Sequence, residues 1–124
     1  MQMAILKQGD FLIASIQTII SDQGLIDLKD TLSEQVGLYR IKGVIIDVTT
    51  LDVLDSFSTR TLHAIAYTLK LRGAETIIVG IQPDVAFAMI QLGLKLDDVK
   101  TALNLEEGLK LLKININRET VDGK

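Results

Sequence analysis

The stretch Val44-Ile45-Ile46-Asp47-Val48, which Gly43 precedes and Thr49-Thr50 follows, decides the fold class. A short β-branched run bounded by turn residues is typical of a central strand that is buried on both faces. A second run of this kind, Thr76-Ile77-Ile78-Val79, follows the next predicted helix. Such strands belong to parallel sheets that helices cover on both sides, so the two runs predict an α/β domain.

The segments around these strands predict further strands and helices in alternation. Extended segments at 4–7 and 11–16, joined by Gln8-Gly9-Asp10, predict an opening hairpin. Apolar spacing and end signals predict four helices and one more strand. The helices are expected near 25–40, 56–71, 83–92 and 104–117, and the strand at 99–103. This order predicts one domain at 1–117, a mixed β-sheet packed with about four helices, and a polar C-terminal tail at 118–124.

Helical spacing also predicts which side chains of the first two long helices face the core. In the first helix the inward stripe is expected to be Leu25, Leu28, Leu32, Val36 and Tyr39. In the second it is expected to be Leu62, Ile65, Ala66 and Leu69. His63 falls beside this second stripe, so we expect a surface or partner-facing position for it.

Composition limits the classes of function. Of 124 residues, 48% are apolar and 23% charged, with a formal net charge of −3 and no cysteine. These values predict a globular domain and exclude disorder, disulfides and a broad basic surface for nucleic acid. No apolar run is long enough to span a bilayer, and the apolar stretch at the start of the sequence is too short for a signal peptide. We therefore expect a soluble cytoplasmic domain with neither nucleic acid nor membrane as a partner.

The hydrophobic residues are mostly aliphatic, because aromatic residues make up only 4% of the chain and the mean hydropathy is +0.32. Two interpretations stay open: part of the aliphatic surface packs against other subunits, or the aliphatic residues fill a tightly packed core. The first predicts self-association or co-assembly through exposed Leu, Ile or Val side chains.

The sequence contains no recognisable catalytic apparatus. There is no glycine-rich phosphate-binding motif, and one histidine without cysteine does not make a metal site. Asp47 is expected inside its strand and not at the strand end, which disfavours a receiver-type phosphoacceptor. We therefore predict a protein that is not an enzyme and that carries no cofactor and no metal.

The segment Leu51-Asp52-Val53-Leu54-Asp55-Ser56-Phe57-Ser58-Thr59 is chemically unusual. It follows a central strand and leads into a helix, at the sheet end where α/β domains bind ligands. Three hydroxyl side chains lie near a helix N-terminus, whose free N–H groups favour an anion. The same residues also fit ordinary capping by Asp55 or Ser56, and the spacing alone leaves both interpretations open.

Asp55-Ser56 after the strand at 44–48 resembles the phosphorylation site of STAS domains, the anti-sigma factor antagonists. The resemblance covers roughly 4–116 and is strongest to the RsbS-type scaffold proteins of the bacterial stressosome. Further matching motifs are Ser15-Ile16-Gln17, Gly80-Ile81-Gln82-Pro83 with Val85-Ala86, and Thr101-Ala102-Leu103 before Leu105-Glu106. Simple antagonists usually carry glycine two residues after the serine, whereas Phe57 and Ser58 follow here, and this favours the stressosome subgroup.

The resemblance implies a non-catalytic scaffold and phospho-switch of a bacterial stress response. Such a protein assembles with itself and with sensor paralogues that carry a C-terminal STAS domain. It sequesters a switch serine/threonine protein kinase and releases that kinase when phosphorylated. The alternatives are a freestanding anti-sigma factor antagonist and, from another class, a small-ligand or nucleotide-binding domain.

Ser56 matches the phosphoacceptor of the family, and Ser58 is a second candidate. Helical spacing favours Ser56, because Ser58 lies four residues before Leu62 and is expected to point inward. Ser56 precedes the first turn and is expected to be accessible to a kinase. We expect the neighbouring Asp55, Phe57 and Thr59 to contact the partner protein.

Overall fold

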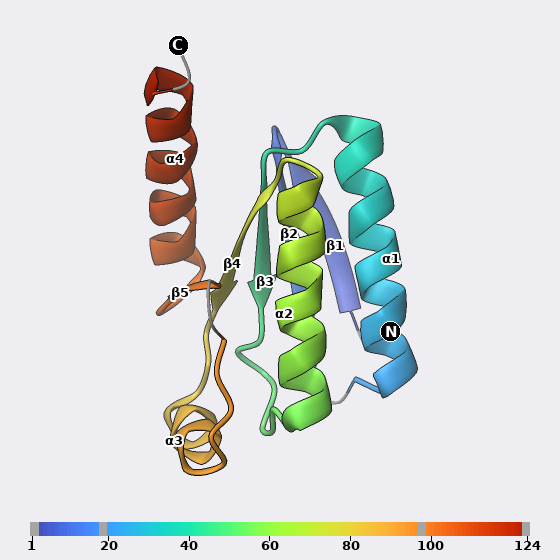
Figure 1. Cartoon of the computed structure of the whole chain (residues 1–124), viewed down its shortest axis with the longest axis vertical. Coiled ribbons are helices and arrows are strands. Elements are labelled where there is room, and N and C mark those ends of the chain that lie inside the picture. The colour runs from blue at the N-terminus through green and yellow to red at the C-terminus, as the bar shows by residue number, and fades with distance from the viewer. Residues whose placement is uncertain (1–2, 18–19, 97–98, 123–124) are drawn as a thin grey trace.

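A five-stranded mixed sheet in the order β1-β2-β3-β4-β5 forms the centre of the protein (Figure 1). The computed structural model describes residues 3–17, 20–96 and 99–122. β1 pairs antiparallel with β2, and all the other neighbours pair in parallel. The strands are β1 Met3–Gln8, β2 Phe11–Ile16, β3 Gly43–Asp47, β4 Glu75–Val79 and β5 Lys100–Ala102. This topology confirms the predicted mixed α/β sheet with its opening hairpin.

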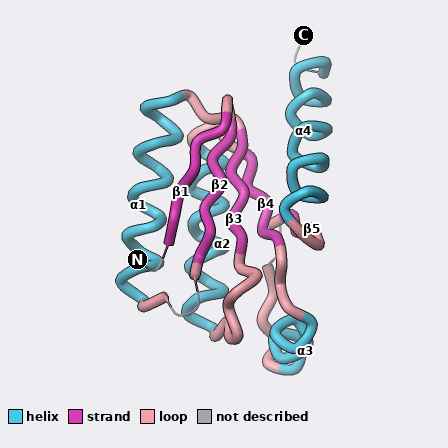
Figure 2. The backbone as a smooth tube through the Cα atoms, turned by 180° about the vertical axis from the view of Figure 1, so that it is seen from behind, coloured by secondary structure: helices cyan, strands magenta, loops and turns pink. Residues whose placement is uncertain are grey.

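Four helices surround the sheet at three places, as Figures 1 and 2 show. They are α1 Asp22–Tyr39, α2 Ser56–Leu71, α3 Pro83–Gln91 and α4 Leu105–Asp122. α1 and α2 pack side by side on one face, because two successive crossovers of the same hand place their helices on the same side. α4 covers the other face, and α3 lies beyond the end of the sheet where the parallel strands finish.

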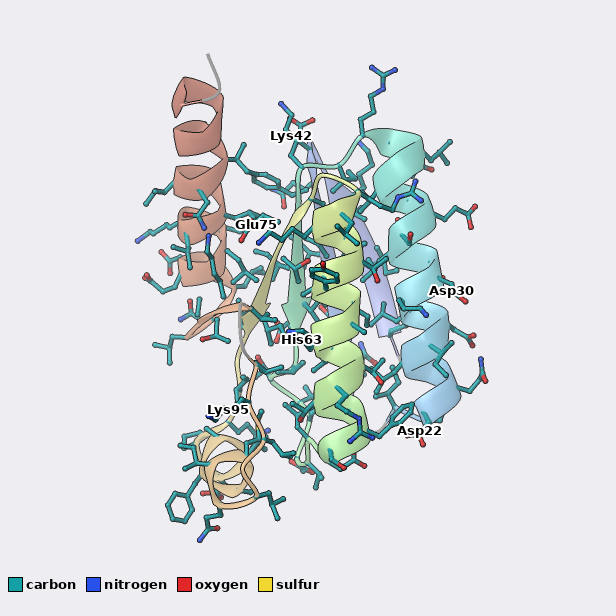
Figure 3. The ribbon with its side chains drawn as sticks, in the orientation of Figure 1. Asp22, Asp30, Lys42, His63, Glu75 and Lys95 are labelled. Atoms are coloured by element: carbon teal, nitrogen blue, oxygen red, sulfur yellow. The ribbon has the colours of Figure 1, made fainter. Side chains whose placement is uncertain are left out.

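α1 and α2 run parallel to each other, so both helices begin at one end of the molecule and finish at the other. Figure 3 shows Asp22, the first residue of α1, at one end and Lys42, shortly after α1, at the opposite end. α4 continues through Asp122, into the segment that we expected to be a polar tail. Among the described residues, no helix is both long and apolar enough to cross a membrane.

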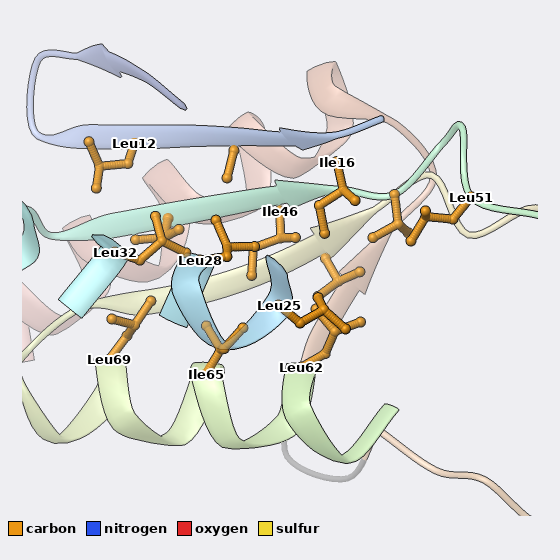
Figure 4. Packing of buried hydrophobic residues seen from close by; sticks show 14 of the residues in the cluster. Leu12, Ile16, Leu25, Leu28, Leu32, Ile46, Leu51, Leu62, Ile65 and Leu69 are labelled. Atoms are coloured by element: carbon orange, nitrogen blue, oxygen red, sulfur yellow. The ribbon is translucent and has the colours of Figure 1, made fainter. Parts of the chain in front are cut away.

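The sheet divides the core into two clusters, one on each face. Between the sheet and α1 and α2, side chains such as Leu28, Ile46 and Ile65 are fully buried (Figure 4). On the other face Ile45, Ile77 and Val79 of the sheet form a smaller cluster with Leu112 of α4. Successive residues of one strand supply opposite faces, which confirms that the central strands are buried on both sides.

The two inward stripes are confirmed except at Tyr39. That side chain is 48% exposed, and the Lys7 ammonium lies 5.6 Å from its ring centroid. Tyr39 is the last residue of α1, where the helix has passed the edge of the packed region. Aliphatic side chains fill the core. Among the described residues, eleven large apolar side chains are exposed in addition.

Two glycines allow α4 to lie close to the sheet. A Cβ atom at Gly108 would meet Val79 Cγ1 at 2.5 Å, and one at Gly43 would meet Leu112 Cδ2 at 2.5 Å. Both distances are far shorter than ordinary van der Waals contact. The absence of a side chain at these positions therefore sets the spacing between α4 and the sheet.

Candidate functional site

The loop between β3 and α2 lies at the end of the sheet where the parallel strands finish. Two long-range hydrogen bonds anchor it from opposite sides. Thr50 Oγ1 donates to the carbonyl oxygen of Ile16 at 2.7 Å, and Gln82 Nε2 donates to the carbonyl oxygen of Thr49 at 2.6 Å. The loop is thus tied to the end of β2 on one side and to the N-cap residue of α3, which follows β4, on the other.

Two side chains of the same loop also pack into the core. Leu51 and Leu54 are buried, whereas Asp52 and Val53 between them are exposed, Val53 by 70%. β3 ends at Asp47 and not one residue later, so the expectation that Asp47 lies inside the strand is wrong. Its carboxylate accepts hydrogen bonds from the N–H and the hydroxyl of Thr49, and is therefore engaged in the turn after β3.

Asp55 is the N-cap of α2. Its carboxylate accepts a hydrogen bond from the Ser58 N–H at 2.7 Å, and its carbonyl oxygen accepts one from the Thr59 N–H at 2.9 Å. The hydrogen bonds from Ser58 lower the pKa of Asp55, and the nearby Arg60 guanidinium lowers it further. The structure thus selects Asp55, between the two capping residues that the sequence left open, as an ionised cap.

Ser56 is the first residue of α2 and its side chain is exposed, which confirms the expected accessibility. Phe57 and Ser58 are half-buried, and Phe57 packs against the main core cluster. At a helix start the first amide N–H groups have no intrahelical acceptor, so an anion on Ser56 would lie near unsatisfied donors. Of the two candidate serines, Ser56 offers the more accessible hydroxyl.

Thr59 requires a correction. We expected it to contact a partner, but only 3% of it is exposed, so its side chain has almost no surface to offer. Its Oγ1 is buried with no hydrogen-bond partner among the described residues. Thr59 stands three residues before Leu62 and seven before Ala66, and this helical spacing marks it as a member of the inward stripe.

A cleft of about 340 Å³ opens beside the capping residue. Its lining combines apolar side chains with three carboxylates, those of Asp22, Asp52 and Asp55, and includes Ser58. Among the described residues, no three His, Cys, Asp or Glu side chains are grouped so that they could hold a metal ion. The negative charge of these three carboxylates favours a partner group that is neutral or cationic.

His63 lies away from this end of the molecule, about midway along α2 (Figure 3). It is half-buried and lines a smaller cavity of about 190 Å³ with Tyr67, Lys70 and Val99. This placement confirms a surface position for His63 and separates it from Asp55 and the serines.

Replacing Asp55 with alanine is expected to lower the free energy of unfolding by about 1 kcal/mol at neutral pH, because the Ser58 N–H loses its acceptor. Since the pKa of Asp55 is lower in the folded chain, its contribution is complete above the unfolded-state value and disappears as pH falls through the folded-state value. The stability difference between the wild type and the variant should therefore shrink below about pH 4. Denaturant unfolding at several pH values measures it.

Asp52→Ala is the matched control, because it removes an exposed carboxylate from the same loop without removing a cap. We expect its effect to stay within about 0.5 kcal/mol, as for other surface substitutions. If Asp55→Ala and Asp52→Ala are equally stable, Asp55 does not stabilise the start of α2.

Comparison with known proteins supplies independent information. A family model described as STAS domain matches residues 2–108. The RsbS protein of Moorella thermoacetica, solved as a serine-to-glutamate variant, is 36% identical with a TM-score of 0.79, over 95% of this chain and 99% of that one. A chain in a solved structure of the stressosome, which is described as a signal integration and transduction hub, is 38% identical. Its TM-score is 0.76, and the match covers 93% of this chain and 99% of that one.

A curated relative is longer than the region it shares. The RsbT co-antagonist protein RsbRD of Bacillus subtilis is 29% identical over 80 residues, which are 64% of this chain and 29% of that protein. The shared region is therefore less than a third of RsbRD, and most of RsbRD has no counterpart in this alignment.

Proposed function

The chain belongs to the STAS domain family, and from this premise we propose that it is a scaffold and phospho-switch of a stressosome-type assembly. In this proposal the chain acts in the cytoplasm and catalyses no reaction itself. It holds a switch serine/threonine protein kinase while Ser56 is unmodified and releases the kinase once Ser56 is phosphorylated. The observation that carries the proposal is the exposed Ser56 at the start of α2, in a chain similar to RsbS over 95% of its length.

The local geometry supports Ser56 over Ser58 as the phosphoacceptor. A kinase must bring the hydroxyl oxygen of its substrate in line with the γ-phosphate of ATP, so the side chain must project into solvent. Ser56 meets this requirement, whereas Ser58 is half-buried and its N–H is held by Asp55. Asp55 and the half-buried Phe57 are the neighbours that we propose as partner contacts.

The assembly part of the proposal rests on the relatives. Similarity to a chain of the stressosome supports assembly of this chain with copies of itself. Similarity to RsbRD, a co-antagonist of RsbT, supports sensor paralogues with a related STAS domain as further members of the assembly. The kinase partner is inferred from the family resemblance and from the accessible serine.

Reconstitution tests the proposal. We expect the chain, a sensor paralogue and the kinase from the same genome to elute together as a large particle in size-exclusion chromatography. Addition of ATP and Mg²⁺ should release the kinase, with phosphate mapped to Ser56 by mass spectrometry. Ser56→Ala should bind the kinase but block its release, because no acceptor hydroxyl remains.

Ser58→Ala is the matched control, since it removes a hydroxyl two residues further along α2 and should leave release unchanged. Phosphate found only on Ser58 or Thr59 would contradict the assignment of Ser56. A small complex with an anti-sigma factor, and no large particle, would instead identify a freestanding antagonist.

A further inference from the structure

A groove of about 330 Å³ runs between α1 and α2, beside the candidate phosphoacceptor. The two helices lie side by side and begin at the same end of the molecule (Figure 1). α1 lines the groove with Ile26 and Lys29, and α2 lines it with Phe57, Arg60, Thr61 and Ala64. The lining shares no residue with the cleft beside Asp55, so the two recesses are separate features of this surface.

The charged groups of the groove are both cationic. Lys29 is half-buried, Arg60 is exposed, and no described residue that lines the groove is acidic. Among the described residues, neither cation forms an ion pair with its own chain, although Arg60 lowers the pKa of Asp55 from a distance. The Thr61 hydroxyl already donates to the carbonyl oxygen of Phe57 at 2.8 Å. In a chain with a formal net charge of −3, the groove is thus a local positive site.

The rest of the lining is apolar, and this limits what fits there. Ile26 and Phe57 are half-buried, and Phe57 also packs against the main core cluster. A matching ligand brings a carboxylate for the two cations and an apolar side chain for Ile26 and Phe57. Carboxylates make charge-assisted and often bidentate hydrogen bonds to arginine, which fix the orientation of the ligand. An acidic segment of a protein offers both groups, whereas a small inorganic anion offers only charge.

We propose that this groove binds an acidic segment of the switch kinase, with a carboxylate of that segment between Arg60 and Lys29. The inference rests on the proposed function, because it takes the kinase of that proposal as the partner. Arg60 lies four residues after Ser56 on α2, which is about one turn and about 6 Å along the helix. A kinase that brings its active site onto Ser56 therefore also covers Arg60.

The same placement links the groove to release of the kinase. A phosphate on Ser56 would lie about one turn from the carboxylate that Arg60 holds, and the two anions repel each other. Side chains four residues apart are neighbours on a helix surface, so the phosphate also competes with the kinase for the Arg60 guanidinium. The groove thus brings a negative group of the kinase close to the site of phosphorylation.

Titration of the kinase against variants of the chain tests the groove, with ADP in place of ATP so that Ser56 keeps its hydroxyl. We expect Arg60→Glu to weaken binding at least about tenfold and Lys29→Glu about fivefold, because each places a carboxylate opposite that of the kinase. Arg60→Lys should weaken binding only about threefold, since lysine keeps the charge but loses the bidentate fork.

Lys113→Glu is the matched control, because it reverses the charge of an exposed residue on α4, on the opposite face of the sheet. It changes the net charge as much as Arg60→Glu does, so it separates the groove from the charge of the whole chain. It should bind the kinase like the wild type, and circular dichroism should show all the variants folded.

Cross-linking identifies the occupant of the groove. The chain has no cysteine, so Ala64→Cys places a single thiol at the groove and Asn117→Cys places one on α4. Both positions are exposed. A photo-cross-linker attached at position 64 should join the chain to a kinase peptide that contains Asp or Glu, mapped by mass spectrometry. The same reagent at position 117 should not reach the kinase.

The outcomes distinguish this inference from the function on which it rests. A wild-type chain that does not bind the kinase overturns both. A wild type that binds the kinase and releases it on phosphorylation, with Arg60→Glu binding equally tightly, overturns the groove alone. A cross-link from position 64 to a basic kinase segment, to a sensor paralogue or to a second copy of this chain also overturns the groove alone.

Discussion

Phosphorylation of Ser56 is expected to weaken kinase binding by more than a hundredfold while leaving the fold unchanged. The phosphate adds a charge of about −1.5 to −2 at neutral pH. Within the chain, the N-terminus of α2 stabilises this charge by about 0.3–1 kcal/mol, and the adjacent ionised Asp55 opposes it by a comparable amount. The two internal effects nearly cancel, so neither should move α2.

Across the kinase interface the balance is different. A kinase surface that fits the neutral Ser56 hydroxyl beside Asp55 would meet new negative charge that is partly removed from water. Like-charge contact in such a place costs several kcal/mol, and each 1.4 kcal/mol is tenfold in affinity. A loss of about 3 kcal/mol therefore gives more than a hundredfold without a conformational change.

Titration of the kinase against unmodified and fully phosphorylated chain measures this effect, with circular dichroism to verify the fold. Ser56→Ala should bind like the unmodified chain. Ser56→Asp should weaken binding only partly, because a carboxylate carries a single charge. Equal affinities for the two forms would show that Ser56 is not the switch.

The sequence predicts the elements of the fold well because their signals are local. The two β-branched runs are the central strands, and α2 spans Ser56–Leu71 as predicted, since Asp55 caps its start and Gly73 follows its end with a φ of +93°. Asn104, where the last helix was expected to begin, caps α4 by accepting a hydrogen bond from the Glu107 N–H at 2.9 Å. Such capping contacts span only three residues and can be inferred from spacing.

The parts of the site that depend on distant segments could not be predicted. Thr50 and Gln82 anchor the loop through bonds that cross 34 and 33 residues, and no local pattern indicates them. Thr59 is a different case, because its spacing to Leu62 already indicated burial, but its hydroxyl suggested a surface role. The exposure of Ser56 was predicted correctly because a position at the very start of a helix is a local property.

The Gly108→Val substitution is expected to destabilise the chain by about 3 kcal/mol, because α4 packs against β4 without room for a side chain. A Cβ atom there would meet Val79 Cγ1 at 2.5 Å and Ile45 Cδ1 at 3.4 Å. Val79 and Ile45 are fully buried beneath α4, so neither side chain can move aside. Overpacking of this kind typically costs about 1–3 kcal/mol, and valine adds two methyl groups beyond the Cβ.

A matched pair of alanine substitutions isolates the steric effect from helix propensity. Gly→Ala within a helix gains about 0.5–1 kcal/mol from propensity alone. At Gly37, in α1, a new Cβ would meet only the guanidinium end of the Arg72 side chain. This exposed side chain can move into solvent, so Gly37→Ala should stabilise the chain by about that gain. Gly108→Ala should destabilise it, because the clash with a buried strand exceeds the same gain. Urea unfolding of both variants provides the test, and a stabilised Gly108→Ala would show that α4 can move away from the sheet without loss.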